Sequence, residues 1–246
     1  MNVLDLFSGI GGFSLGLERA GMKTVAFCEI EEFPRKVLKK HWPNVPIYED
    51  VRELNATRLD ADGITGIDVI CGGFPCQDIS DAGHQAGIDG ERSGLWREYE
   101  RIIGELRPQY VIVENVAALL NNGLSRVLGG LASIGYDAEW NCIQAAAVGL
   151  PHFRDRVWIL AYPAQSRQAT VLSEIDFACE KSARETRERF QLCGTRSGGT
   201  RWVPNGCICS VVDGVSAELD GLATAGNAVV PQIPEIIGRA IMESAA

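Results

Sequence analysis

Residues 67–77 read IDVICGGFPCQ, and this stretch decides the fold because an apolar run breaks there into two glycines. A short run rich in Ile and Val is typical of a buried strand, and open α/β sheets place their ligands beyond the carboxyl ends of such strands. The break therefore delivers Cys76 to that edge of the sheet. A second apolar run, residues 110–113, ends in the same way at Glu114. The two runs together predict a thiol and a carboxyl group in one crevice.

Strand-like and helical patterns alternate along the chain, which favours a mainly parallel sheet with helices on both faces. The fold class expected is therefore α/β, with a doubly wound, Rossmann-like sheet. The chain closes with an apolar helix that we expect to pack back on the sheet. The predicted strands span 2–7, 23–30, 44–51, 67–74, 109–114, 138–148 and 157–162, and the predicted helices span 13–20, 31–41, 94–106, 119–134 and 233–242.

The first predicted strand runs into a glycine-rich turn, residues 7–13, which opens a helix. Glycines let the backbone approach a ligand, although this turn alone is equally compatible with a plain strand-to-helix connection. The next two strands end in Glu29 and Asp50, and an acid about 20 residues past the glycines suits a ribose. The turn has no Lys, so it does not resemble a phosphate cradle. Two acids beside a nucleoside suit a cationic cofactor, and the sulfonium S-adenosylmethionine fits.

Composition limits the classes of function. The chain has 246 residues, 46% of them hydrophobic, which suffices for one sizeable α/β domain with a small extra lobe. Its formal net charge of −9 argues against a general polyanion binder, because a phosphate backbone is held by Lys and Arg. The one basic stretch is 181–201, which contains six basic residues and two acidic ones. It could be a solvated helix face, but the glycines and Trp202 that follow favour an irregular binding lobe.

Location and metal content also follow from residue usage. The first residues carry no basic segment and include Asp5, so we expect no signal peptide, and no apolar run is long enough to span a membrane. Eight cysteines without an export signal are typical of reduced thiols in the cytoplasm. Cys207 and Cys209 lack a partner pair at zinc-finger spacing, and the three histidines are scattered, so no metal site is expected.

Five motifs stand in order at predicted strand ends or loops: DLFSGIGG (5–12), GFPCQ (73–77), ENV (114–116), GLPHFRDRV (149–157) and GNAV (226–229). Together they resemble the DNA (cytosine-5) methyltransferase family. One of them departs from the family's Gln-x-Arg-x-Arg block, since His152 replaces the Gln. The resemblance covers residues 1–163 almost continuously and 220–243 at the end.

The resemblance implies a role for each matching residue. Cys76 is similar to the nucleophile, Glu114 to the acid that engages cytosine N3 and its amino group, and Arg156, with Arg154 nearby, to the group that orients the pyrimidine and the acid. The polar loop 77–92 matches a closing loop, within which Gln77, Ser80 and Arg92 are similar to DNA-binding positions. S-adenosyl-L-methionine is the cofactor implied, and the residues similar to its binding site are Phe7, Ser8, Gly9, Gly11, Gly12, Glu29, Ile30, Asp50, Val51, Pro75, Leu95, Asn227 and Val229.

The resemblance also implies a division into domains. Residues 1–163 plus 220–246 match the catalytic domain, and 164–219 stand in for a much larger target-recognition region, as in short phage or prophage members. No Thr-Pro-Arg-Glu-like block occurs in that middle segment. The expected substrate is cytosine in double-stranded DNA, and the chain is expected to be a monomer. A cognate restriction nuclease encoded elsewhere would complete a restriction-modification system.

Two other functions stay open. The same chemistry could act on tRNA cytosine, or the chain could be a DNA-binding relative with a recognition lobe too small for turnover. A flavin or NAD oxidoreductase is less well supported, because neither the loop spacing nor the local charge suits a pyrophosphate.

Overall fold

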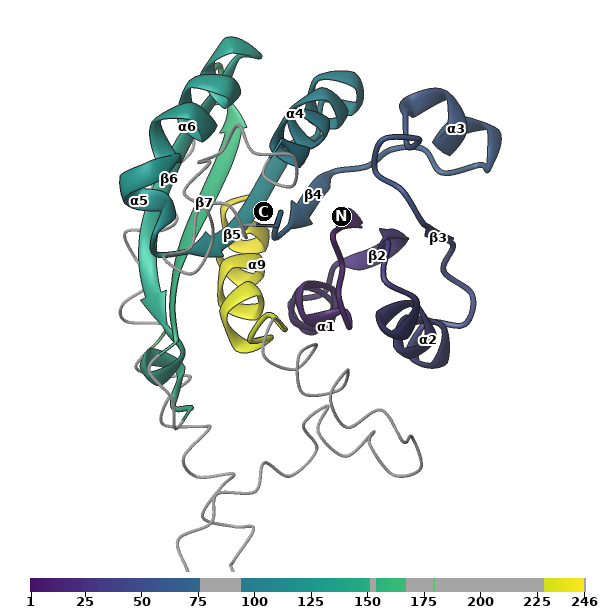
Figure 1. The fold of residues 1–246 in the computed structure, drawn as a ribbon, viewed down its shortest axis with the longest axis horizontal. Coiled ribbons are helices and arrows are strands. Elements are labelled where there is room, and N and C mark those ends of the chain that lie inside the picture. The colour runs from purple at the N-terminus through teal and green to yellow at the C-terminus, as the bar shows by residue number, and fades with distance from the viewer. Residues whose placement is uncertain (76–93, 151–153, 167–178, 180–227, 246) are drawn as a thin grey trace, which may run out of the picture.

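The computed structural model describes residues 1–75, 94–150, 154–166, 179 and 228–245, which form a seven-stranded sheet between two layers of helices (Figure 1). The strand order is β3-β2-β1-β4-β5-β7-β6. Along the chain, β2 and β3 are thus added on one side of β1, and the later strands are added on the other side. Open α/β sheets bind ligands where the order reverses, which here is beyond the carboxyl ends of β1 and β4.

Five strands form the parallel part of the sheet. They are β1 (Asn2–Leu6), β2 (Lys23–Cys28), β3 (Ile47–Tyr48), β4 (Val69–Gly72) and β5 (Tyr110–Val116). The four longer strands are nearly continuous apolar runs and are buried almost throughout, as expected for strands covered on both faces.

The last two strands are antiparallel. β7 (Asp155–Pro163) lies between β5 and β6 (Tyr136–Gln144) and runs opposite to both, with Arg156 paired with Val116. A strand that runs in reverse begins at the edge where its parallel neighbours end. The first residues of β7 therefore lie beside the last residues of β5.

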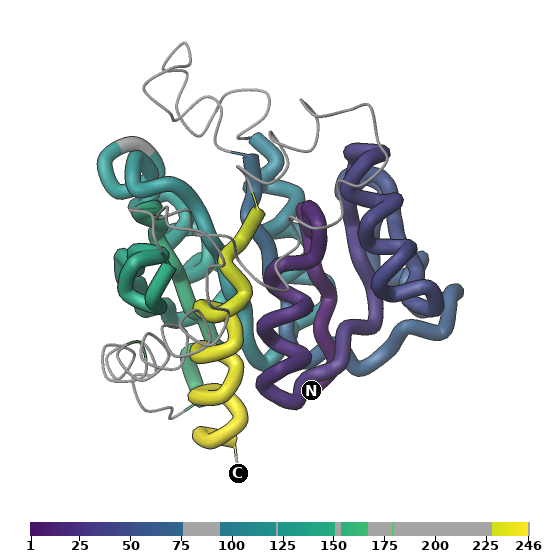
Figure 2. The backbone as a smooth tube through the Cα atoms, turned by 90° about the horizontal axis from the view of Figure 1, so that it is seen from below, coloured from purple at the N-terminus to yellow at the C-terminus, as the bar shows by residue number. Residues whose placement is uncertain are grey.

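Helices cover both faces. α9 (Gln232–Ser244), α1 (Gly12–Arg19) and α2 (Glu32–His41) lie side by side on one face (Figure 2). A Cβ at Gly16 would lie 2.3 Å from the Pro231 carbonyl oxygen, so this glycine permits the close contact of α1 with the start of α9. The other face carries α3 (Ala56–Ala61), α4 (Leu95–Leu106), α5 (Leu119–Asn122) and α6 (Leu124–Ser133).

The α/β class predicted from the sequence is confirmed, and three details of the prediction are wrong. The strand predicted over 44–51 has only two residues, because Pro46 cannot donate a ladder hydrogen bond. The single helix predicted over 119–134 is two helices that meet at Gly123. The strand predicted over 138–148 ends at Gln144, and a 3-10 helix (Ala145–Val148) follows it. This short connection makes the final strand pair antiparallel, which agrees with the mainly parallel sheet predicted.

Candidate active site

The loop after β1 is shaped by three residues with positive φ: Phe7 (53°), Gly9 (53°) and Gly11 (87°). Glycine is required at Gly11, where a Cβ would lie 2.6 Å from the Trp42 ring. A Cβ at the next residue, Gly12, would lie 2.4 Å from the Val229 carbonyl oxygen. The loop therefore turns tightly against α2 and the segment before α9. A Cβ built at Gly9 meets nothing within 4 Å among the described residues, so the backbone there is open to a ligand.

Glu29 follows β2 and holds this loop. Its Oε2 accepts a 2.7 Å hydrogen bond from the Gly9 N–H, and its Oε1 accepts one of 2.7 Å from the Glu31 N–H. The residue is 7% exposed, and burial raises the pKa of the carboxyl above its ordinary value. Ser8 lies beside it, with its hydroxyl donating to the Asp5 carbonyl oxygen at 2.6 Å. The ends of β1 and β2 thus form one hydrogen-bonded unit around a buried carboxyl group.

A second acid lies beneath the glycine loop. Asp5 is fully buried, and its Oδ2 accepts a 2.7 Å hydrogen bond from the Ser14 hydroxyl of α1. Cys71 of β4 is its cross-strand partner. Burial is the main reason why the pKa of Asp5 rises from 3.8 to about 7, with only partial compensation from Ser14. Asp5 therefore ties β1 to α1 below the ligand crevice.

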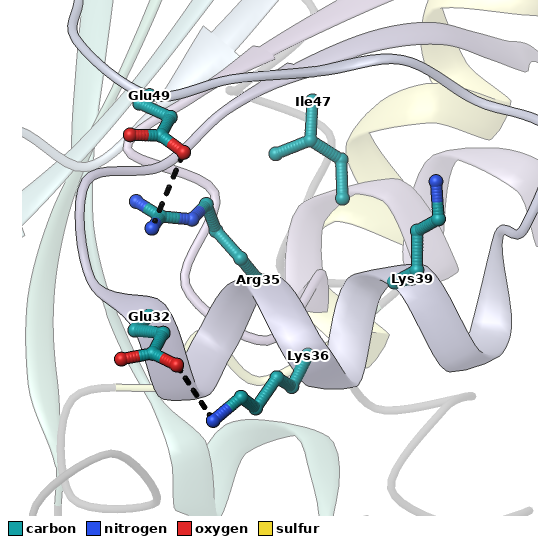
Figure 3. A pocket seen from close by; sticks show the side chains of 6 residues that line it. All are labelled: Glu32, Arg35, Lys36, Lys39, Ile47 and Glu49. Atoms are coloured by element: carbon teal, nitrogen blue, oxygen red, sulfur yellow. Dashed lines mark ion pairs between the residues drawn. The ribbon is translucent and has the colours of Figure 1, made fainter.

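The ends of β2 and β3 are joined by Arg35 of α2 (Figure 3). Its Nη1 donates to the Ile30 carbonyl oxygen at 2.5 Å and its Nη2 lies 3.4 Å from Glu49 Oε1. Arg35 and Glu49 border an open groove of about 300 Å³ between α2 and β3. The side chain of Ile30 is 59% exposed, an unusual position for a large apolar residue next to two acids. Asp50 follows Glu49, and both of its oxygens accept hydrogen bonds from Arg52.

Glu114 and Arg156 form an ion pair across β5 and β7. Arg156 Nε lies 2.9 Å from Glu114 Oε1, and the two side chains are 21% and 10% exposed. Burial raises the pKa of Glu114, while the nearby charges of Arg156 and Arg154 counteract part of that rise. The pair exists because β7 runs in reverse and so brings its first residues to the end of β5. The acid is thus held in place yet remains easier to protonate than an ordinary glutamate.

The segment after β4 passes directly beside Glu114. A Cβ at Gly73 would lie 2.8 Å from Glu114 Oε2, so only glycine leaves room for the carboxylate. The buried Asn115 side chain adds a second link, since its Nδ2 donates to the Phe74 carbonyl oxygen at 3.1 Å. The strand ends that lead to Cys76 and to Glu114 are therefore adjacent.

The remaining residues predicted from sequence fall into two groups. Pro75, Leu95 and Val229 are partly buried, Leu95 as the first residue of α4, and Val51 is buried in the core. The other predicted positions, together with almost all of the proposed recognition lobe, lie outside the described residues: Cys76, Gln77, Ser80, Arg92 and Asn227.

The carboxyl ends of β1, β2 and β3 form a rim whose groups suit an adenosine-like cofactor. It offers a carboxyl at Glu29, a second at Asp50, open backbone at Gly9 and an exposed apolar side chain at Ile30. This combination fits a ribose and an adenine ring. Among the described residues, no group of three His, Cys, Asp or Glu could hold a metal ion. No helix in the described ranges is both long and apolar enough to cross a membrane.

The sheet order, the glycine loop and the acid after β2 define a Rossmann-like α/β protein with a nucleoside-type site at its switch point. Residues 1–198 match the family model for C-5 cytosine-specific DNA methylases, and the chain belongs to that family.

Individual relatives agree with this placement. The chain is 36% identical over 182 residues to the type II methyltransferase M2.BsuMI of Bacillus subtilis, which covers 71% of this chain and 45% of the relative. It is 37% identical over 165 residues to M.Eco47II of Escherichia coli, covering 65% and 39%. The chain thus spans less than half the length of either relative.

Solved structures share the fold. A DNA modification methyltransferase encoded within an E. coli prophage superposes with a TM-score of 0.59 at 28% identity, over 69% of this chain and 48% of that one. The S. pombe Dnmt2 methyltransferase has a TM-score of 0.59 at 20% identity, over 72% and 55%. At that identity the second likeness concerns the fold alone.

Proposed function

We propose that the chain is a DNA (cytosine-5-)-methyltransferase that transfers a methyl group from S-adenosyl-L-methionine to C5 of a flipped-out cytosine. The observation that carries the proposal is the buried Glu114–Arg156 ion pair beside Gly73, three residues before Cys76. An acid with a raised pKa, an arginine that holds it and a nearby thiol are the groups that activation of a pyrimidine needs.

The cofactor would be held at the ends of β1, β2 and β3. The Gly9 backbone and the Glu29 carboxyl would bind the ribose, Asp50 the adenine amino group, and Ile30 and Phe7 the faces of the ring. When bound, S-adenosylmethionine supplies the electrophilic methyl group that ends on C5. The remaining wall would come from Ser8, Gly11, Gly12, Val51, Pro75, Leu95, Asn227 and Val229.

Cys76 would act as the nucleophile. Cytosine C5 is a poor nucleophile within its aromatic ring, so the thiolate first adds to C6 and makes C5 enamine-like, which divides one hard step into easier ones. After methylation C5 gives its proton to solvent, the C5–C6 double bond forms again, the C6–sulfur bond breaks, and Cys76 leaves as the thiolate. A free thiol has a pKa near ~8.5, so Cys76 needs surroundings that favour the thiolate, such as the positive charge of Arg156.

Glu114 would stabilise the ring during the addition. Negative charge develops on N3 as the thiolate adds, and a protonated Glu114 can donate a hydrogen bond there. The direction of its pKa shift supports this role, because burial favours the neutral acid. Arg156 binds Oε1 of Glu114, so the ion pair fixes the orientation of Oε2, which lies on the Gly73 side. Arg154 adds positive charge nearby.

Duplex DNA hides the target base, so it must be flipped out at a cost of roughly a few kcal/mol. We assign DNA contacts to Gln77, Ser80 and Arg92 and target recognition to 164–219, with 1–163 plus 220–246 as the catalytic domain. We also propose that the protein is a cytoplasmic monomer and that it acts together with a cognate restriction nuclease. The basic stretch 181–201 supports a local phosphate contact in an otherwise acidic chain.

The test is methyl transfer by the chain itself. The protein is incubated with labelled S-adenosylmethionine and either duplex DNA or tRNA, and bisulfite sequencing of DNA from expressing cells reports the target. We expect labelled 5-methylcytosine in DNA, and no transfer by Cys76→Ser despite retained cofactor binding. Transfer to tRNA alone would redirect the proposal to RNA. Cofactor and DNA binding without any transfer would establish a non-catalytic relative, and a Cys76→Ser protein that still methylates would refute the mechanism.

A further inference from the structure

Arg101 of α4 makes four contacts with groups around the loop that follows β3. Its Nη2 donates to the carbonyl oxygens of Val51 at 3.1 Å and Leu54 at 2.8 Å. Its Nε lies 2.8 Å from Glu98 Oε2, and its Nη1 lies 2.7 Å from Glu105 Oε1. All three guanidinium nitrogens are thus engaged, two by carboxylates of the same helix and the third by the loop.

Val51 and Leu54 bury their side chains in the core, and hydrogen bonds hold the backbone of the loop. Residues 50–55 form neither helix nor strand, and their own backbone bonds are two turn contacts, Glu53 N–H to the Asp50 carbonyl oxygen and Leu54 N–H to that of Val51. One more link comes from α4, since Glu105 Oε2 accepts a 3.0 Å hydrogen bond from the Ala56 N–H. Apolar packing therefore keeps the loop against α4, while Arg101 and Glu105 make polar contacts with its backbone and with the start of α3.

We propose that Arg101 is a positioning residue for the adenosine half of the cofactor, an inference that rests on the proposed function. Arg101 contacts the carbonyl of Val51, the residue after Asp50, so it acts through the loop rather than on the ligand. Its two carboxylate partners fix the plane of the guanidinium, and that plane fixes the two loop carbonyls. The energy of exposed ion pairs is small, and these side chains are about a third exposed, so the effect expected is on geometry more than on folding.

Arginine is specifically required for this arrangement. A lysine carries one nitrogen on a flexible stem, so it can pair with a carboxylate or reach a carbonyl but cannot occupy both carboxylates and both carbonyls in one plane. Glutamine removes the charge and most of the donors. Arg101→Lys should therefore weaken the positioning of the loop less than Arg101→Gln does, and both substitutions keep a long side chain on the helix.

The test compares Arg101→Gln, Arg101→Lys and a matched control, Arg239→Gln. Arg239 also pairs with a glutamate one turn away on its helix, Glu235, and no hydrogen bond or ion pair to the glycine loop or to residues 50–55 is found for it. Calorimetry measures the Kd for S-adenosylmethionine and for S-adenosylhomocysteine, and kinetics separate the KM for the cofactor from the KM for DNA and from kcat. Thermal unfolding without ligand reports the stability of each variant.

We expect Arg101→Gln to raise both cofactor Kd values by about ten-fold and Arg101→Lys to raise them by an intermediate factor. The KM for DNA and kcat at saturating cofactor should stay within about two-fold of wild type, and Arg239→Gln should match wild type throughout. If Arg101→Gln does not fold, Arg101→Lys carries the same prediction. Wild-type affinity in a folded Arg101 variant, or equal losses for cofactor and DNA, would overturn the inference. A wild-type chain that binds no S-adenosylmethionine would instead refute the proposed function.

Discussion

Asp5 should make the protein less stable as the pH rises. Its pKa is 3.8 in the unfolded chain and about 7 in the folded one, so the folded state holds a proton that the unfolded state has lost throughout that interval. Linkage then lowers the free energy of unfolding by about 1.4 kcal/mol per pH unit within the interval, and hardly at all above it. From about pH 5 to about pH 8 the loss attributable to Asp5 is about 2 to 3 kcal/mol.

Asp5→Asn isolates this contribution. Asparagine stays neutral in both states and can still accept the hydrogen bond from Ser14. Other acids with raised pKa values, Glu29 and Glu114, remain in both proteins and cancel in the comparison. The stability of the variant relative to wild type should therefore rise by about 2 to 3 kcal/mol between about pH 5 and about pH 8.

Urea denaturation of both proteins across that pH range measures the difference. Asp60→Asn, at an exposed position of α3, is the control and should give a curve parallel to wild type. An Asp5→Asn curve parallel to wild type would show that the buried carboxyl does not retain its proton, and the reasoning from burial would be refuted.

Three further predictions concern close contacts and the proposed acid. Gly73→Ala puts a Cβ 2.8 Å from Glu114 Oε2 and should lower kcat by about ten-fold or more while cofactor affinity stays unchanged; Gly104→Ala, where a Cβ meets nothing within 4 Å, should leave kcat unaltered, and equal rates for both would contradict the crowding argument. Gly16→Ala places a Cβ 2.3 Å from the Pro231 carbonyl oxygen and should cost about 1–3 kcal/mol in urea denaturation, whereas Gly129→Ala should be neutral or stabilising; a stable Gly16→Ala would mean that α1 and α9 can separate freely. If protonated Glu114 assists the addition, kcat should fall as the pH rises through its raised pKa, and Glu114→Gln should lose that fall; a variant that keeps the same alkaline limb would assign it to another group.

The sequence could predict the parts of the site that depend on strand ends. Buried strands and glycine breaks have strong local signals, so the glycine loop, Glu29 and Glu114 were all placed at the carboxyl edge from residue patterns alone. Arg156 entered through the resemblance, because its place beside Glu114 depends on the reversal of β7, which no local pattern specifies. The short α3 was missed, although its cap, Asn55, accepts a hydrogen bond from the Arg58 N–H and is a usable start signal.

Contacts between distant segments could not be predicted. Arg101 resembles an ordinary charge on an amphipathic helix, and its bonds to the carbonyl oxygens of Val51 and Leu54 arise only when α4 packs against the loop after β3. Gly73 likewise shows its purpose only once Glu114 is beside it. Such residues act through geometry that is set across tens of residues of chain, so composition and spacing carry no trace of them.

Because β7 runs in reverse, the stretch that follows it is joined to the sheet at two separate points. The strand delivers Pro163 to the amino edge of the sheet, whereas the described chain resumes at Ala228 and Val229, against Gly12 at the opposite edge. The two described segments that flank this stretch thus lie at opposite edges of the sheet, and every described strand comes before Ala164. If 164–219 selects the target as proposed, exchange of that segment between relatives would change which DNA is chosen while the described strand pairs stay the same.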